Sequence, residues 1–136
     1  MKEISLEIIT PSKVIYSGNV KSITVPGTKG SFQVLYNHAP IISTFEIGRI
    51  KIVDTDDREL NFATSGGTVE VSNNKILVLA ETAELPENID LERAKESLDR
   101  AQKRLLTKKD IDIQRAEGAM ARAKNRINIF TKYRTN

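Results

Sequence analysis

The stretch that decides the fold is Ile89–Arg126, IDLERAKESLDRAQKRLLTKKDIDIQRAEGAMARAKNR. Its apolar residues recur at spacings of three and four, the period of one face of an α-helix. One set is Leu91, Ala94, Leu98, Ala101 and Leu105, and the other is Ile113, Ala116, Met120, Ala123, Ile127 and Phe130. The polar break Thr107–Lys109 between them is long enough to reverse the chain, and Asp110 is available as N-cap of the second helix. These signals predict an antiparallel helical hairpin.

Arginines flank both apolar stripes. The first helix carries Arg93, Arg100 and Arg104, and the second carries Arg115, Arg122 and Arg126. If the two seams face each other, guanidinium groups from both helices can converge on one side, where they would suit phosphate or carboxylate oxygens. The alternative is a solvated flank whose charge is balanced by acidic neighbours. Those neighbours are Glu92, Glu96, Asp99 and Glu117.

Charge is distributed unevenly along the 136 residues. Residues 1–86 contain 8 Lys and Arg against 10 Asp and Glu, a net charge of −2, whereas residues 87–136 contain 13 against 8, a net charge of +5. The second part therefore has the charge to attract an anionic partner.

Metal and membrane roles find little support in the composition. The chain has no cysteine and one histidine, so a thiolate site is excluded and a metal role is not expected. Residues 1–10 alternate in polarity, and no apolar run approaches the length of a membrane span. We expect a soluble protein without a cleaved signal.

Short alternating runs with frequent turns occupy residues 3–80, which predicts an antiparallel sandwich or flattened barrel. The apolar positions of the expected strands are Ile4, Leu6, Ile8, Val20, Ile23, Val25, Phe32, Val34, Leu35, Ile50, Ile52, Leu60, Phe62 and Ile76 to Leu79. Turns are expected at Thr10–Ser12, Pro26–Gly30 and Asp54–Asp57, and a tight hairpin at Ser72–Asn74, whose asparagines tolerate positive φ.

Three features of this half could carry chemistry, but each has a structural explanation. His38 has no companion for acid–base or metal chemistry and is interpreted as a turn or interface residue. Gly27–Gly30 is too short for a phosphate loop and is interpreted as a turn. Ser65–Gly67 is expected to let a strand bend or approach another backbone closely.

The composition changes after Ala80. Residues 81–88 form a polar connection in which Pro86 separates the last strand from the first helix. We therefore place a β-sandwich domain at residues 1–86 and a helical hairpin domain at residues 87–136, an α+β arrangement.

In their order and spacing, the short motifs resemble the epsilon subunit of the F-type ATP synthase, over essentially the whole chain. The residues that carry the resemblance are Ile9 to Pro11, Val25 to Gly27 with Gly30, Asn37 to Pro40, Ser65 to Gly67, Val69 to Val71 and Val78 to Ala80, followed by the two-helix segment. The resemblance implies a sandwich of about ten strands and a C-terminal hairpin, in a subunit that is not itself an enzyme.

The same resemblance implies a place in the rotating central stalk, coupling proton translocation to ATP synthesis. The partners would be the gamma subunit, the membrane ring of c subunits and, through an extended helical arm that inhibits ATP hydrolysis, the alpha and beta subunits of the catalytic head. The location would be peripheral, on the cytoplasmic side of the cell inner membrane, without membrane insertion. Ring and gamma contacts are expected at Pro26, Gly27, Lys29, Gly30, Ser31 and His38.

ATP is the further ligand that the resemblance implies, as a regulator rather than a required cofactor. Residues Ile89–Ala94 match the Ile/Leu-Asp-x-x-Arg-Ala motif of nucleotide-binding epsilon subunits. By this resemblance the adenine end would meet Glu84, Ile89, Asp90, Arg93 and Ala94, and the phosphates would meet Arg100, Arg122 and Arg126. The alternative is that Asp90 is only an N-cap and the arginines a solvated flank.

Two other functions fit the sequence less well. A free nucleic-acid or anion-binding module could use the basic hairpin, but the helices have few aromatic residues and many interspersed acids, so base stacking and a continuous phosphate track are not expected. A hydrolase would need a nucleophile and base pair that the sequence does not offer.

Overall fold

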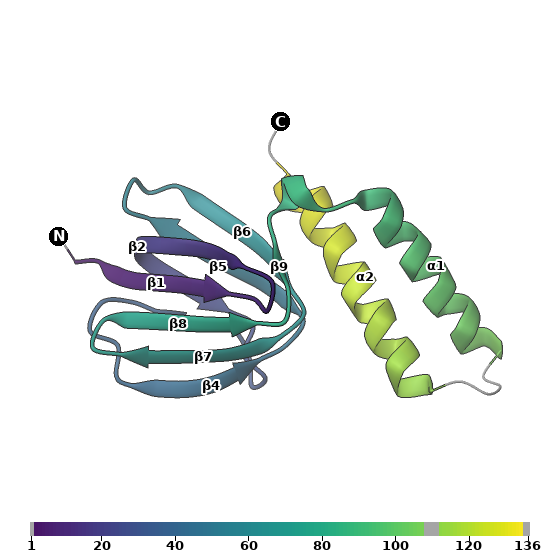
Figure 1. The fold of residues 1–136 in the computed structure, drawn as a ribbon, viewed down its shortest axis with the longest axis horizontal. Coiled ribbons are helices and arrows are strands. Elements are labelled where there is room, and N and C mark those ends of the chain that lie inside the picture. Colours follow the sequence, from purple (N-terminus) through teal and green to yellow (C-terminus); the bar gives the residue numbers. More distant parts are fainter. Residues whose placement is uncertain (1, 108–111, 135–136) are drawn as a thin grey trace. The chain divides into compact units, whose positions relative to one another are not determined.

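A computed structural model describes residues 2–107 and 112–134. It divides the chain into two compact units, Met1–Leu85 and Pro86–Asn136. The described part of the first unit is built of strands and that of the second of helices, so the expected α+β class is confirmed (Figure 1). None of the helices in the described ranges is long and apolar enough to cross a bilayer.

The first unit contains nine strands within its described residues. They are β1 (Ile4–Ile9), β2 (Val14–Val25), β3 (Phe32–Val34), β4 (Ile41–Phe45), β5 (Gly48–Asp54), β6 (Glu59–Thr64), β7 (Gly67–Ser72), β8 (Lys75–Ala80) and β9 (Ala83–Glu84). Hydrogen bonds join them in the order β4-β7-β8-β1-β2-β5-β6-β9, with β3 added to β2. All pairs are antiparallel except β1 with β8.

The long strand β2 turns this continuous sheet into a sandwich. Its first part pairs with β1, from Val14 to Val20, and its second part pairs with β5, from Val20 to Thr24. The register shifts between Val20 and Ser22, and such an irregularity lets a strand bend and pass from one layer to the other. Strands β1, β8, β7 and β4 form one layer, and β5, β6 and β9 continue the other (Figure 1).

Alternation of apolar and polar residues fills the space between the layers. In β1, Ile4, Leu6 and Ile8 are at most 1% exposed, whereas Ser5 and Glu7 face solvent. Side chains from β2 to β8 join them in one apolar cluster. Burial of this kind stabilises by about 25 cal/mol per Å² of apolar area, so the sandwich has a substantial core of its own.

Three strands were not among those that the sequence predicts. In β4 exposure alternates along the strand, but the sequence does not show this, because Ile42 is apolar and 78% exposed. Strand β7 begins at the glycine pair that suggested a bend, and β9 has only two residues, inside the stretch interpreted as a polar connection. Their pairing is decided by neighbouring strands, which local periodicity does not reveal.

The predicted turns are present. Ser72 pairs with Lys75 across Asn73 and Asn74, both at positive φ, which is the expected tight hairpin. The Asp57 N–H donates to the Asp54 carbonyl at 3.1 Å. A Cβ atom at Gly67 would lie 2.0 Å from the Leu79 carbonyl oxygen, so the glycine pair permits the close backbone approach predicted there.

The second unit is the predicted antiparallel hairpin of α1 (Leu91–Thr107) and α2 (Ile113–Tyr133), preceded by a short 3-10 turn, η1 (Pro86–Asn88) (Figure 1). The N-cap prediction for α2 was wrong. The cap is Asp112, whose Oδ1 accepts the Arg115 N–H at 3.1 Å, because a cap side chain must reach the third helical residue. Asp110 itself lies outside the described residues.

Small residues form most of the buried face of the hairpin. Ala94, Ala101, Ala116 and Ala123 are at most 4% exposed, as the predicted stripes require. Ile113, at the start of the second stripe, is 44% exposed, and Ile129, which lies off that stripe, is 1% exposed. Since Ile129 is about 120° around the helix from Ala123, the end of α2 buries a second side.

Candidate functional site

The residues predicted to meet ATP fall in both units. Glu84 is in β9 of the first unit, half-buried and paired in register with Ala63 of β6. The other seven belong to the hairpin unit, and they are Ile89, Asp90, Arg93, Ala94 and Arg100 on the connector and α1, with Arg122 and Arg126 on α2.

The Ile-Asp-x-x-Arg-Ala motif forms the start of α1. Asp90 Oδ1 accepts the Arg93 N–H at 3.1 Å, and the Asp90 carbonyl accepts the Ala94 N–H at 3.0 Å. Ala94 is fully buried in the hairpin seam. The capping role considered for Asp90 is thus confirmed, and this role leaves its second carboxylate oxygen available to another donor.

Four arginines share one relationship to the seam. Each immediately precedes a buried alanine, and the pairs are Arg93–Ala94, Arg100–Ala101, Arg115–Ala116 and Arg122–Ala123. In an antiparallel pair of right-handed helices, equal offsets from the facing seams fall on the same side of the hairpin. The backbone therefore directs arginines from α1 and α2 toward one side, which we call the arginine row.

Two of the arginines expected to contact phosphate have side chains that lie against residues of their own helix. Arg100 Nη2 donates to Ser97 Oγ at 3.1 Å. The Arg122 guanidinium passes over Gly118, where an added Cβ would be 3.2 Å from Nη1. Arg126 is half-buried, and its Nε is shielded from solvent. A ligand shared by these side chains would have to draw Arg100 and Arg122 out of these positions.

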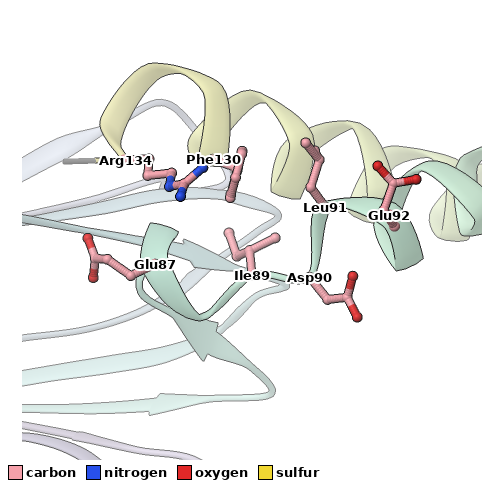
Figure 2. A pocket seen from close by; sticks show the side chains of 7 residues that line it. All are labelled: Glu87, Ile89, Asp90, Leu91, Glu92, Phe130 and Arg134. Carbon is pink, nitrogen blue, oxygen red and sulfur yellow. The ribbon is translucent and has the colours of Figure 1, made fainter. Parts of the chain in front are cut away.

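A shallow hollow of about 430 Å³ opens where the connector enters the hairpin, between the start of α1 and the end of α2. It is lined by Glu87, Ile89, Asp90, Leu91, Glu92, Phe130 and Arg134. Ile89 and Phe130 point toward each other across it, whereas the carboxylates of Glu87 and Asp90 point away from the ring (Figure 2). The Arg134 guanidinium lies over the Phe130 ring, 4.9 Å from its centre, a distance typical of cation–π contacts.

Sequence reasoning found two of the seven residues that line this hollow. Ile89 and Asp90 were predicted as ligand contacts, but Phe130 was assigned only to the apolar stripe and Arg134 to nothing. The available signal was the spacing of four that connects Arg126, Phe130 and Arg134 along one side of α2. The packing of α2 against η1 is a long-range contact, which this spacing does not reveal.

The residues expected to meet gamma and the ring form two separate turns of the sandwich. Pro26 to Ser31 follow β2, and the Gly30 N–H donates to the Gly27 carbonyl at 3.0 Å. His38 is in a turn after β3, where its N–H donates to the Leu35 carbonyl at 3.1 Å and its Nδ1 lies 2.7 Å from the Ala39 carbonyl oxygen. Strand β3 runs between the two turns, so they can meet different partners.

The architecture is that of a two-part subunit, a β-sandwich followed by a basic helical hairpin. Residues 3–86 match the family described as ATP synthase, Delta/Epsilon chain, beta-sandwich domain, and residues 87–130 match its long alpha-helix domain. The chain belongs to this family, and the resemblance seen in its sequence is confirmed.

Curated relatives are epsilon chains. The ATP synthase epsilon chain of Desulfitobacterium hafniense strain DCB-2 is 44% identical over 91% of this chain and 93% of its own length. That of Brevibacillus brevis is 40% identical over 79% of this chain and 82% of its own. The chain is thus similar to ATP synthase epsilon chains over most of its length.

Solved structures share the fold at lower identity. A chain in the Euglena gracilis mitochondrial ATP synthase OSCP/F1/c-ring structure gives a TM-score of 0.71 at 20% identity, covering 96% of this chain and 79% of that one. A chain in the Tetrahymena thermophila mitochondrial ATP synthase central stalk/c-ring structure gives 0.60 at 20% identity, covering 99% and 98%.

Proposed function

We propose that this protein is a non-catalytic rotor subunit of the central stalk, coupling proton translocation to ATP synthesis and restraining ATP hydrolysis through its helical arm. Family membership over both units supports the proposal. The partners are gamma, the ring of c subunits and the alpha and beta subunits of the head. The location is the cytoplasmic face of the inner membrane.

The sandwich anchors the protein in the stalk. It holds the large apolar core and the two turns, and we assign Pro26 to Ser31 to the ring and His38 to gamma. A fragment ending at Glu87 retains all nine strands of the described residues and should bind gamma as the full chain does. A fragment that folds but does not bind gamma would contradict this division of labour.

The extended arm inhibits by electrostatic attachment to the acidic surface of the head. Arg115, Arg122 and Arg126 supply the charge, and salt should weaken the attachment. The measurement is ATP hydrolysis by complexes that carry the full chain or the fragment ending at Glu87. At low ionic strength, complexes with the full chain should hydrolyse ATP more slowly than complexes with the fragment. This difference in rate should shrink as the salt concentration rises. Equal rates at all salt concentrations would contradict the inhibitory role.

ATP holds the arm folded, and the arginine row is the observation that carries this part of the proposal. Because the row draws on both helices, it exists only when they are packed together. A triphosphate bound there favours the folded arm by its differential affinity for the two states, and low ATP releases the arm.

Calorimetric titration of the full chain with ATP tests the site. Arg100→Ala, Arg122→Ala and Arg126→Ala should each weaken binding, since each removes a charged phosphate donor. Matched controls are Lys95→Ala and Lys124→Ala, because these exposed lysines follow Ala94 and Ala123 and so point to the opposite flank. No heat at millimolar ATP, or equal losses in arginine and lysine variants, would refute the site.

A further inference from the structure

The hollow between the start of α1 and the end of α2 is built from segments far apart in the chain. Glu87, Ile89 and Leu91 line it from the connector and the start of α1, and Phe130 and Arg134 line it from the end of α2 (Figure 2). The hollow therefore exists only while the two ends of the hairpin are together. A ligand that fills it binds the folded hairpin selectively.

The lining suits a flat heteroaromatic group. Ile89 is 4% exposed and Phe130 is half-buried, so the centre is apolar. The stacked ring and guanidinium of Phe130 and Arg134 present two planar groups. The rim is acidic, through Glu87, Asp90 and Glu92, so it accepts amino N–H donors and repels phosphate. A volume of about 430 Å³ is within the range of small-molecule pockets.

Two arginines of the proposed phosphate site precede Phe130 along α2. Arg126 is four residues before Phe130, on the same side of the helix and about 6 Å along its axis, and Arg122 is a further turn away. A phosphate chain that leaves the hollow in this direction meets cationic groups in succession. The acidic end and the cationic side thus match the two ends of one nucleotide.

We propose that Phe130 and Arg134 form the wall against which the base of the bound nucleotide lies, so that recognition of the base requires the end of α2 to be docked on the start of α1. This rests on the proposed ATP site and adds the two residues that separate base recognition from phosphate recognition. The arginine row alone binds any polyphosphate, whereas the wall makes the site selective for a nucleotide.

The test compares ATP with inorganic tripolyphosphate, titrated calorimetrically into the full-length protein and its Phe130→Ala, Phe130→Leu and Arg134→Ala variants. Base–aromatic stacking predicts about a 5- to 150-fold weaker affinity for ATP in Phe130→Ala, with tripolyphosphate affinity unchanged. Phe130→Leu keeps apolar volume but removes the ring, so it should also bind ATP more weakly. Lys132→Ala, exposed in the same turn and outside the hollow, is the control.

The outcomes separate the two ideas. If the native protein does not bind ATP, the proposed nucleotide site fails and the wall fails with it. If the native protein binds ATP and Phe130→Leu and Arg134→Ala bind it equally well, the site stands and the wall is overturned. Parallel losses for ATP and tripolyphosphate, with helix content unchanged by circular dichroism, would also overturn the wall, because they would assign Phe130 and Arg134 to hairpin packing alone.

Discussion

Asn37 and Asn74 bond to each other across the sandwich surface. The Asn37 N–H donates to Asn74 Oδ1 at 2.7 Å, and Asn74 Nδ2 donates to Asn37 Oδ1 at 3.2 Å. Both residues have φ near +60°. The pair ties the turn that contains His38 to the β7–β8 hairpin, so it holds a proposed gamma contact in place.

Replacing Asn74 with alanine should cost more stability than replacing Asn73. Both positions have positive φ and share the backbone penalty, but the two side-chain hydrogen bonds belong to Asn74. The expected difference between Asn74→Ala and Asn73→Ala is about 1–2 kcal/mol in free energy of unfolding, measured with urea. Equal losses would mean that the bonded pair contributes nothing.

Gly67→Ala should be among the most damaging single substitutions in the sandwich. The new Cβ would be 2.0 Å from the Leu79 carbonyl oxygen, and backbone must move to make room. We expect a loss of about 3 kcal/mol or more, seen as a lower urea midpoint. The control is Gly18→Ala, whose nearest neighbour would be a Tyr16 side-chain atom at 3.6 Å and which should change stability by less than about 0.5 kcal/mol.

Because Asp112 caps α2, its side chain should contribute more to the stability of the hairpin than that of Asp110. Asp112→Ala should lower hairpin stability by about 1 kcal/mol, because the Arg115 N–H loses its acceptor, whereas Asp112→Asn should retain most of it. Helix content followed by circular dichroism during thermal unfolding measures the effect. Asp110→Ala is the comparison. A larger loss of hairpin stability in that variant would support Asp110, the cap predicted from the sequence.

Tyr16 should make the sandwich less stable in alkali. Burial and then the nearby Asp54 carboxylate raise its pKa above the ordinary value of about 10. The unfolded chain therefore loses this proton first as pH rises, and stability declines above about pH 10. Tyr16→Phe should show a smaller decline in urea midpoint between about pH 8 and 10.5. An identical decline in native and variant protein would contradict this assignment.

Much of the fold follows from local periodicity. Strand β1 and the alanines of both helices are predictable because one face of each element is apolar at the period of its backbone. Strand β4 is not, since Ile42 is apolar and exposed, and neither is β9, whose two residues are strand only because β6 offers an edge. Ile129 was missed because helical periodicity marks one buried face, and the end of α2 has two.

The candidate site also has one part that local periodicity predicts and one part that it does not. The arginine row is local, because each arginine is fixed relative to the alanine that follows it. The wall of Phe130 and Arg134 depends on which turn of α2 meets the connector, a register that local periodicity does not set. The sequence therefore indicates what kind of ligand the hairpin attracts, whereas the hollow indicates where the ligand's uncharged end would lie.

The alanine seam should make the hairpin open more readily than the sandwich. An alanine side chain buries little area, so Ala94, Ala101, Ala116 and Ala123 contribute less than the isoleucines and valines of the sandwich core at about 25 cal/mol per Å². Amide hydrogen exchange read by mass spectrometry should be faster throughout α1 and α2 than in β1 and β8.

Ala123→Gly should accelerate amide exchange further in both helices and leave exchange in the strands unchanged. The matched control is Ala121→Gly, which has the same cost in helix propensity, about 1 kcal/mol, at an exposed position. The excess acceleration in Ala123→Gly, especially in α1, measures the seam itself. If the two variants exchange alike, or if α1 does not respond to a change in α2, the helices are not held together by these alanines.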